Sequence, residues 1–118
     1  MDRRFVARGL YQKLMDSVLD SEEDVEPVRK ALANGGDPNY SKIDEYYLTT
    51  VLHTAVWGTP YLRQEKIDVL IKEGRCDVNI LDRTDRKTAL TVACWSRRNL
   101  PIVKQLLSLR ADPNIISR

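Results

Sequence analysis

The sequence has little of what catalysis, metal binding or covalent cross-linking needs. Its 118 residues include one histidine and two cysteines. No Ser–His–Asp or Cys–His set can be argued from a single histidine, and no second histidine or cysteine lies at a metal-ligand spacing from it. We therefore expect a protein that is not an enzyme, with no catalytic residue, no metal site and no cofactor.

Long apolar runs and glycine-rich loops are missing as well. Hydrophobic residues make up 42% of the chain, but no run is long enough to cross a bilayer, and residues 1–5 lack the apolar stretch of a secretory signal. The five glycines are scattered, so no phosphate-binding loop is predicted. Together with the low cysteine count, these absences favour an intracellular protein, cytoplasmic or nuclear, with no membrane partner.

What the sequence does have is a repeated pattern. Residues 50–55, Thr-Val-Leu-His-Thr-Ala, recur as Thr-Ala-Leu-Thr-Val-Ala at 88–93. Three Asp-x-Asn elements lie at 37–39, 77–79 and 112–114, and their asparagines are 40 and then 35 positions apart. Self-similarity at this spacing indicates a repeat architecture.

Apolar residues at helical spacing precede each Asp-x-Asn element, which predicts three amphipathic helices. Gly35 and Gly74 follow the first two helices where a left-handed helix end is expected, and Arg110 stands at the third place. Thr50 and Thr88 are suited to cap the helices that start after them. The apolar sets are Val28, Ala31 and Leu32; Ile67, Leu70 and Ile71; and Val103, Leu106 and Leu107.

The pattern resembles the ankyrin repeat, a unit of about 33 residues with a turn, two helices and a Thr-Pro-Leu-His-x-Ala signature. The resemblance covers nearly the whole chain and implies an all-α solenoid of about three helix–turn–helix units with hairpin-like turns. The units span about 8–39, 40–79 and 80–114 in a single domain over residues 1–118. Residues 115–118 would begin a further turn or form a C-terminal stub.

The resemblance also assigns roles to single residues. The histidine equivalent to His53 holds its turn by hydrogen bonds to neighbouring backbone, and Cys94 stands where the family places a small buried residue. The sequence departs from the signature where Val51 and Ala89 replace proline and where Thr91 replaces the second histidine.

The two ends of the array differ. The first helix, with Leu14 and Val18 on one face and polar residues on the other, suits a terminal cap. The third unit keeps repeat-like apolar residues, yet only residues 115–118 follow it. Three alternatives stay open: the chain is a fragment of a longer array, it is complete with an exposed end, or it uses that end for self-association or a partner.

Aromatic residues mark the candidate binding surface. Trp57 and Trp95 each stand five residues after the signature leucine of their unit, a place that in ankyrin proteins faces the concave groove and contacts partners. The long turn at 40–49 carries Tyr46 and Tyr47. The alternatives are that each tryptophan packs against an enlarged neighbouring loop and that one tyrosine packs against the first helices.

Charge is uneven along the chain. Residues 80–118 hold eight Lys/Arg and three Asp/Glu, a net of +5, while the remainder has a net of −3. This basic third unit would attract acidic protein segments or nucleic acid, although Asp82 and Asp85 weaken the second option. The basic residues of the third turn are Arg83, Arg86 and Lys87.

The sequence therefore predicts a protein–protein interaction module, an adaptor, scaffold or inhibitor, that binds its partner through the groove and the turn tips. The alternative function is a nucleic-acid-binding surface on the third unit. The candidate partner-binding residues are Trp57, Trp95, Tyr46, Tyr47, Arg83, Arg86 and Lys87.

Overall fold

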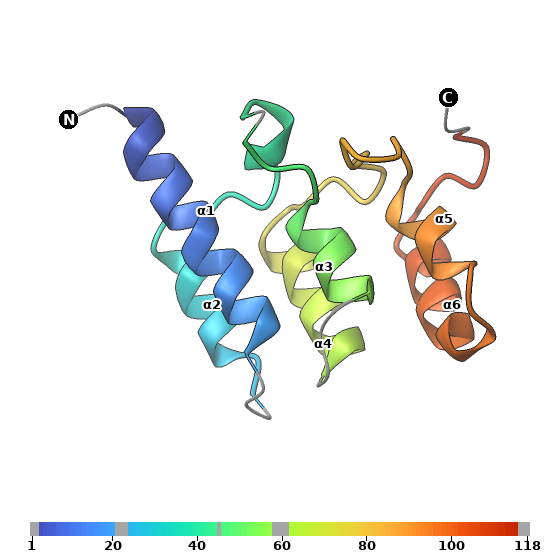
Figure 1. Cartoon of the computed structure of the whole chain (residues 1–118). Helices are drawn as coiled ribbons and strands as arrows, with labels where there is room; N and C mark the ends of the chain where they lie inside the picture. Colours follow the sequence, from blue (N-terminus) through green and yellow to red (C-terminus); the bar gives the residue numbers. More distant parts are fainter. Residues whose placement is uncertain (1–2, 21–23, 45, 58–61, 116–118) are drawn as a thin grey trace.

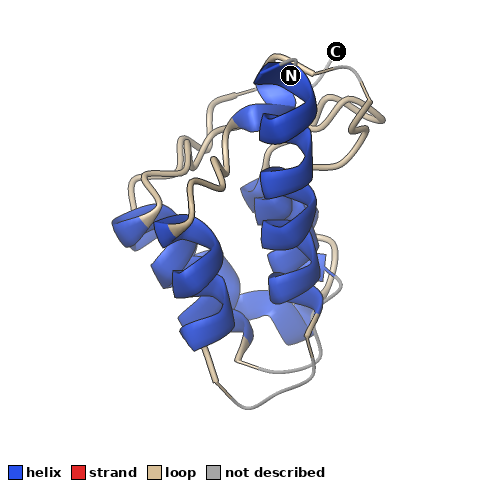
Figure 2. Cartoon of the chain, turned by 90° about the vertical axis from the view of Figure 1, so that its left-hand side faces the viewer, coloured by secondary structure: helices blue, strands red, loops and turns tan. Residues whose placement is uncertain are grey.

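The computed structural model of the chain describes residues 3–20, 24–44, 46–57 and 62–115. All regular structure in these ranges is helical. Three helix pairs stand side by side, with the turns between units at one end (Figure 1). The first helices of the pairs form one layer and the second helices the other, as the turned view shows (Figure 2). The prediction of an all-helical solenoid built from helix–turn–helix units is confirmed.

The helix pairs follow the order of the repeated pattern. The 17-residue α1 and a short α2 form the first pair, and in the second pair α4 continues without a break into one π-helical turn, η2. Two short 3-10 segments, η1 and η3, lie in connections. The bounds are α1 Arg3–Leu19, α2 Glu26–Ala33, η1 Tyr40–Lys42, α3 Val51–Trp57, α4 Arg63–Asp68, η2 Val69–Glu73, α5 Ala89–Ala93, η3 Arg97–Asn99 and α6 Leu100–Ser108.

The predicted apolar stripes form one continuous core. Val28 of α2, Ile67 of α4 and Leu106 of α6 are fully or almost fully buried between the two layers. Leu14 and Val18 of α1 close the core at the first unit. Each such aliphatic side chain contributes about 1.5–3 kcal/mol by leaving water, so packing rather than helix propensity holds these short helices.

The helix ends depart from the prediction in one unit. Gly35 and Arg110 have positive φ angles of 104° and 72°, as expected, but Gly74 has a φ of −83° and the left-handed residue is Arg75, at 55°. The cause is the π-helical turn, which adds one residue before the helix ends. The closing hydrogen bond from Cys76 N–H therefore spans six residues, whereas its counterparts in the other units span five.

Gly74 is required for space rather than for a left-handed conformation. A Cβ at this position would lie 2.7 Å from the carbonyl oxygen of Leu70 and 2.9 Å from a methyl group of Leu32 in the preceding unit. The one-residue insertion is therefore accommodated by close approach between the second and first units.

The Asp-x-Asn elements join neighbouring units. In each element the aspartate carboxylate accepts a hydrogen bond from the asparagine N–H, which shapes the turn. The Asn39 side chain then accepts from Asp77 N–H at 2.7 Å and donates to the Arg75 carbonyl at 3.1 Å. Asn79 accepts from Asp112 N–H at 2.8 Å in the same way. The motif thus fixes the spacing of one turn against the next.

The predicted caps are present at two of the repeat helices. Thr50 accepts a hydrogen bond from the N–H of His53 at 3.0 Å, and Thr88 accepts from Thr91 N–H at 3.2 Å. Asn99 precedes α6 but does not cap it, because its side-chain oxygen accepts from the Arg63 guanidinium at 3.1 Å.

A buried lysine that the sequence pattern did not reveal ties the second unit to the first. Lys66 of α4 has no exposed surface, and its ammonium donates to the carbonyls of Val18 and Asp20 at 2.9 and 2.8 Å. These carbonyls lie at the end of α1, where a cation offsets the negative end of the helix dipole. Burial lowers the pKa of Lys66 from its usual value.

Candidate functional site

A surface groove lies between α3, α5 and the turn of the third unit. Its volume is about 440 Å³. The first helix of the second unit, α3, and the first helix of the third unit, α5, form walls of the groove, and the turn at residues 82–85 closes one side. The groove, as we use the word below, is lined by Thr49, His53, Thr54, Trp57, Asp82, Thr84, Asp85, Val92 and Trp95.

The two tryptophans meet in the groove. Trp57 is 59% exposed and Trp95 is 55% exposed, and their ring centroids are 6.2 Å apart with the planes at 88°. They occupy equivalent positions of their units, Trp57 as the last residue of α3 and Trp95 two residues after the end of α5, so stacking the units brings them edge to face. The indoles are therefore surface residues rather than core. The loop proposed to cover Trp57 includes residues 58–61, which lie outside the described residues.

Lys87 adjoins this aromatic pair. Its ammonium lies 4.0 Å from the centroid of the Trp95 ring, a cation–π contact worth about 0.5–1 kcal/mol at an exposed site. Of the three basic residues predicted for the third turn, Lys87 is the one whose side chain contacts a tryptophan. The contact shows that the ring of Trp95 is placed to receive a cation.

His53 is a turn residue, as the resemblance implies. Its Nε2 lies 2.7 Å from the carbonyl oxygen of Lys87, and its Nδ1 lies 2.6 Å from the Thr50 hydroxyl. A carbonyl oxygen can only accept, so Nε2 carries the proton and Nδ1 accepts from Thr50. Burial is the main cause that lowers the pKa of His53, while the Lys87 carbonyl and the charge of Asp82 oppose it. The ring is neutral, and both of its nitrogens hold the turn.

Two carboxylates give the groove its charge. Asp82 shapes the turn, because its Oδ1 accepts from the N–H of Lys87 at 2.9 Å and from the N–H of Asp85 at 3.3 Å. Asp85 lines the groove from the tip of the same turn. Among the described residues that line the groove there is no Lys or Arg, and the nearest cation shown is the Lys87 ammonium on the ring of Trp95.

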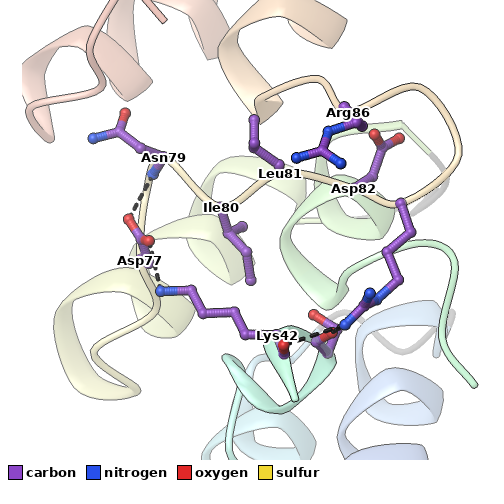
Figure 3. Close-up of a pocket in the computed structure, with 9 residues that line it drawn as sticks. Lys42, Asp77, Asn79, Ile80, Leu81, Asp82 and Arg86 are labelled. Atoms are coloured by element: carbon purple, nitrogen blue, oxygen red, sulfur yellow. Dashed lines mark hydrogen bonds and ion pairs between the residues drawn. The ribbon is translucent and has the colours of Figure 1, made fainter. Parts of the chain in front are cut away.

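Arg83 and Arg86 do not share the groove with the tryptophans. Arg83 donates to the carbonyls of Ser41 and Lys42 at 3.0 and 3.2 Å, which fastens the third turn to the second. Both arginines line a second hollow of about 450 Å³, in which Lys42 pairs with Asp77 at 2.7 Å (Figure 3). The expected single surface of basic and aromatic residues is therefore divided between two places.

The two tyrosines of the long turn have different surroundings. Tyr47 is 8% exposed, packs edge-on against Tyr11 of α1 at 4.6 Å, and donates to the Gln12 side chain at 3.1 Å. Its ring is not available to a partner, so the alternative that one tyrosine packs against the first helices is correct. Tyr46 is 67% exposed, and the Arg8 guanidinium lies 4.9 Å from its ring centroid.

Asp44, which sequence reasoning did not single out, holds this long turn on α1. Its carboxylate accepts from the Arg8 guanidinium at 2.9 Å, from the Tyr40 hydroxyl at 2.7 Å and from the N–H of Tyr46 at 3.0 Å. These donors, with Arg8 the largest contributor, lower the pKa of Asp44 to about 2. Tyr40, Asp44 and Tyr47 therefore hold the insertion at 40–49 on the first unit, and of its described residues Thr49 lines the groove.

The outer face of the third unit corrects the expectation for Cys94. The resemblance implied a buried side chain, but Cys94 is exposed because no further described unit covers α5. Its equivalent in the second unit, Val56, is fully buried by the third unit. Cys94 lines a shallow hollow of about 360 Å³ with Leu100 and Val103. Cys76 is buried, which raises the pKa of its thiol to about 12.

Within the described ranges, no group of three His, Cys, Asp or Glu side chains is placed to hold a metal ion. The same part of the chain has no helix with the length and apolar character needed to cross a membrane.

Comparison with known proteins adds one finding. The family model for ankyrin repeats, in three copies, matches residues 14–117. A search of curated proteins found no match to this chain.

Proposed function

The chain belongs to the ankyrin-repeat family, and from this premise we propose that it binds a partner protein in the groove, as an adaptor, scaffold or inhibitor. Ankyrin repeats are generally protein–protein interaction modules, and domains built from them are typically not enzymes. A binding role of this kind needs a preformed surface rather than a reacting group.

The observation that carries the proposal is the exposed pair of Trp57 and Trp95. Two indoles in contact, each more than half exposed, leave a large apolar surface in water. Tryptophan is enriched among the residues that dominate interface energies, and its truncation in the centre of an interface costs about 2 kcal/mol or more. Burying this pair against a partner would recover that energy.

The rigidity of the groove supports the same proposal. His53 and Asp82 fix the turn that forms one wall, and Arg83 fastens this turn to the preceding unit. A surface that is ordered before binding loses little conformational entropy on association. The proposed binding surface consists of Trp57, Trp95 and Lys87 with the groove wall at residues 82–85.

Affinity capture from cell lysate with quantitative mass spectrometry tests the proposal. We compare the parent chain with Trp95→Ala, Trp57→Ala and the control Phe5→Ala, which truncates an aromatic residue that is 73% exposed on α1. Partners captured by the parent should be lost from both tryptophan variants and kept by the control, with all variants folded. Equal capture by every variant would contradict the proposal.

The salt dependence of binding separates the protein partner from the alternative. Nucleic acid held by several phosphate contacts would lose affinity steeply as salt increases. We expect a shallow salt dependence, because the indoles supply most of the proposed contact surface.

A further inference from the structure

We propose that the groove takes a basic side chain, arginine or lysine, from an extended segment of the partner, with its stem against the indole pair of Trp57 and Trp95 and its charge beside the carboxylates of Asp82 and Asp85. This inference rests on the proposed function and specifies the chemistry of the partner. It differs from the sequence expectation, in which a basic turn attracted an acidic partner.

The first step in the argument is the charge of the groove. Its two ionised side chains are Asp82 and Asp85, and its one other titratable group, His53, is neutral with both ring nitrogens engaged in hydrogen bonds. The arginines of the turn lie in the second hollow, where Lys42 and Asp77 pair, and Asp82 lines both hollows. Besides the ammonium of Lys87 on Trp95, an acidic side chain entering the groove would meet two like charges, and a basic one would meet two opposite charges.

The second step is the aromatic surface. The face of an indole is electron-rich and attracts ammonium and guanidinium groups. Trp57 and Trp95 also keep water away from one side of a side chain that packs against the pair. Aromatic rings and carboxylates around one hollow favour a side chain with an apolar stem and a cationic end, which describes arginine and lysine.

The third step is the position of Lys87. Its ammonium already lies 4.0 Å from the Trp95 centroid, so this chain places a cation of its own beside the proposed site. Lys87 thus shows which interaction the ring makes, and it also competes with an incoming cation for the ring and repels it. Removing the Lys87 charge should strengthen binding of a basic segment, and it should weaken binding of an acidic one. The two partner chemistries predict effects of opposite sign.

The size of the groove suits this ligand. A volume of about 440 Å³ falls within the range of sites that hold small ligands or a few side chains. The groove is open along the surface between α3 and α5, so a segment of chain can lie across it while one side chain packs against the indole pair.

The test uses three matched peptides that share one Ser/Gly/Leu frame and carry arginine, glutamine or glutamate at the same positions. The chain has two tryptophans and both line the groove, so its intrinsic fluorescence reports on the groove when the peptides contain no tryptophan. We expect saturable binding of the arginine peptide, weaker binding of the glutamine peptide and none of the glutamate peptide.

Two charge variants with matched controls complete the test. Lys87→Met keeps an apolar stem on Trp95 and removes one competing exposed cation. It should therefore increase the affinity for the arginine peptide about fivefold. Asp85→Asn should lower the affinity for the arginine peptide by a similar factor. The controls are Lys104→Met on α6 and Asp16→Asn on α1, both exposed and outside the groove lining, and neither should change the affinity.

The outcomes separate this inference from the proposed function. The proposal of a basic ligand would be contradicted if the glutamate or glutamine peptide bound more tightly than the arginine peptide. It would also be contradicted if Lys87→Met weakened binding of the arginine peptide. In both cases the groove would remain a binding site. Absence of any fluorescence change with the arginine peptide would also overturn the proposal of a basic ligand. The proposed function fails separately, when the tryptophan variants capture the same partners as the parent.

Discussion

At the scale of single residues, this molecule uses its single histidine to hold a wall of the groove. The single histidine connects the capping residue of α3 to the turn of the next unit, through Thr50 on one side and the Lys87 carbonyl on the other. Its burial lowers the pKa, so folding favours the neutral ring. The structural role of His53 and the shape of the groove therefore depend on the same two hydrogen bonds.

His53→Ala should lower the free energy of unfolding by about 1–3 kcal/mol near neutral pH, the cost of leaving buried partners unpaired. This difference should shrink as the pH falls. The unfolded state takes up a proton near pH 6.5, while the folded state resists protonation, so the parent loses stability below that pH. Denaturant unfolding between about pH 8 and pH 5 measures both effects. A difference that stays constant across this range would contradict the account.

Lys66 makes a second testable link between units. Lys66→Met keeps an apolar stem but removes the ammonium. The carbonyls of Val18 and Asp20 then lose the hydrogen bonds that the ammonium donates to them. We expect a loss of about 1–3 kcal/mol in the free energy of unfolding. The control is Lys72→Met, an exposed residue whose 3.8 Å ion pair with Asp68 should contribute about 0–1 kcal/mol. Equal effects of the two changes would show that Lys66 has no structural role.

The residue scale also shows what sequence reasoning predicts well and badly. Trp57 and Trp95 were placed together because helical periodicity and the repeat fix the positions of both backbones. The sequence does not locate the ends of the Arg83 and Tyr47 side chains, because these depend on neighbours in another unit, Ser41 for the arginine and Tyr11 for the tyrosine. Cys94 was misplaced because its burial depends on a unit that would have to follow.

At the scale of elements, the helices and their caps follow from local signals, and the irregular turn in the second unit does not. Ile67, Leu70 and Ile71 have the same spacing as the apolar sets of the other two units, so the apolar stripe gives no sign of the added residue. The insertion becomes visible in the backbone, where η2 moves the left-handed position from Gly74 to Arg75. A glycine near a helix end is therefore not sufficient to locate the left-handed residue.

Arg75→Gly should raise the free energy of unfolding by up to about 1 kcal/mol, because a left-handed conformation costs a non-glycine residue more than the added flexibility of glycine. Gly74→Ala should lower it, because the new methyl group would lie against the Leu70 carbonyl and Leu32. Thermal unfolding of the two variants shows whether each substitution raises or lowers the free energy of unfolding. Destabilisation by Arg75→Gly would place the left-handed residue elsewhere.

At the scale of the whole molecule, stability should vary along the stack, because each unit is held mainly by its neighbours. The middle unit is covered on both sides, whereas the third unit has exposed Leu100 and Leu107 on its outer face, at 54% and 46%. In the 118-residue chain, amide hydrogens of α6 should exchange faster than those of α4. Hydrogen-exchange mass spectrometry measures this, and equal protection in a proven monomer would mean that the stack unfolds as one unit.

The proposed binding site lies at the junction of the second and third units, where α3, α5 and the turn at 82–85 meet. Two signals from indole N–H groups are expected in a proton–nitrogen correlation spectrum, because the chain has two tryptophans. Titrating a captured partner into the labelled chain tests the central claim most directly. The account predicts that the signals of both Trp57 and Trp95 shift or broaden with saturation. Unchanged indole signals in a complex that perturbs other residues would show that the partner binds elsewhere.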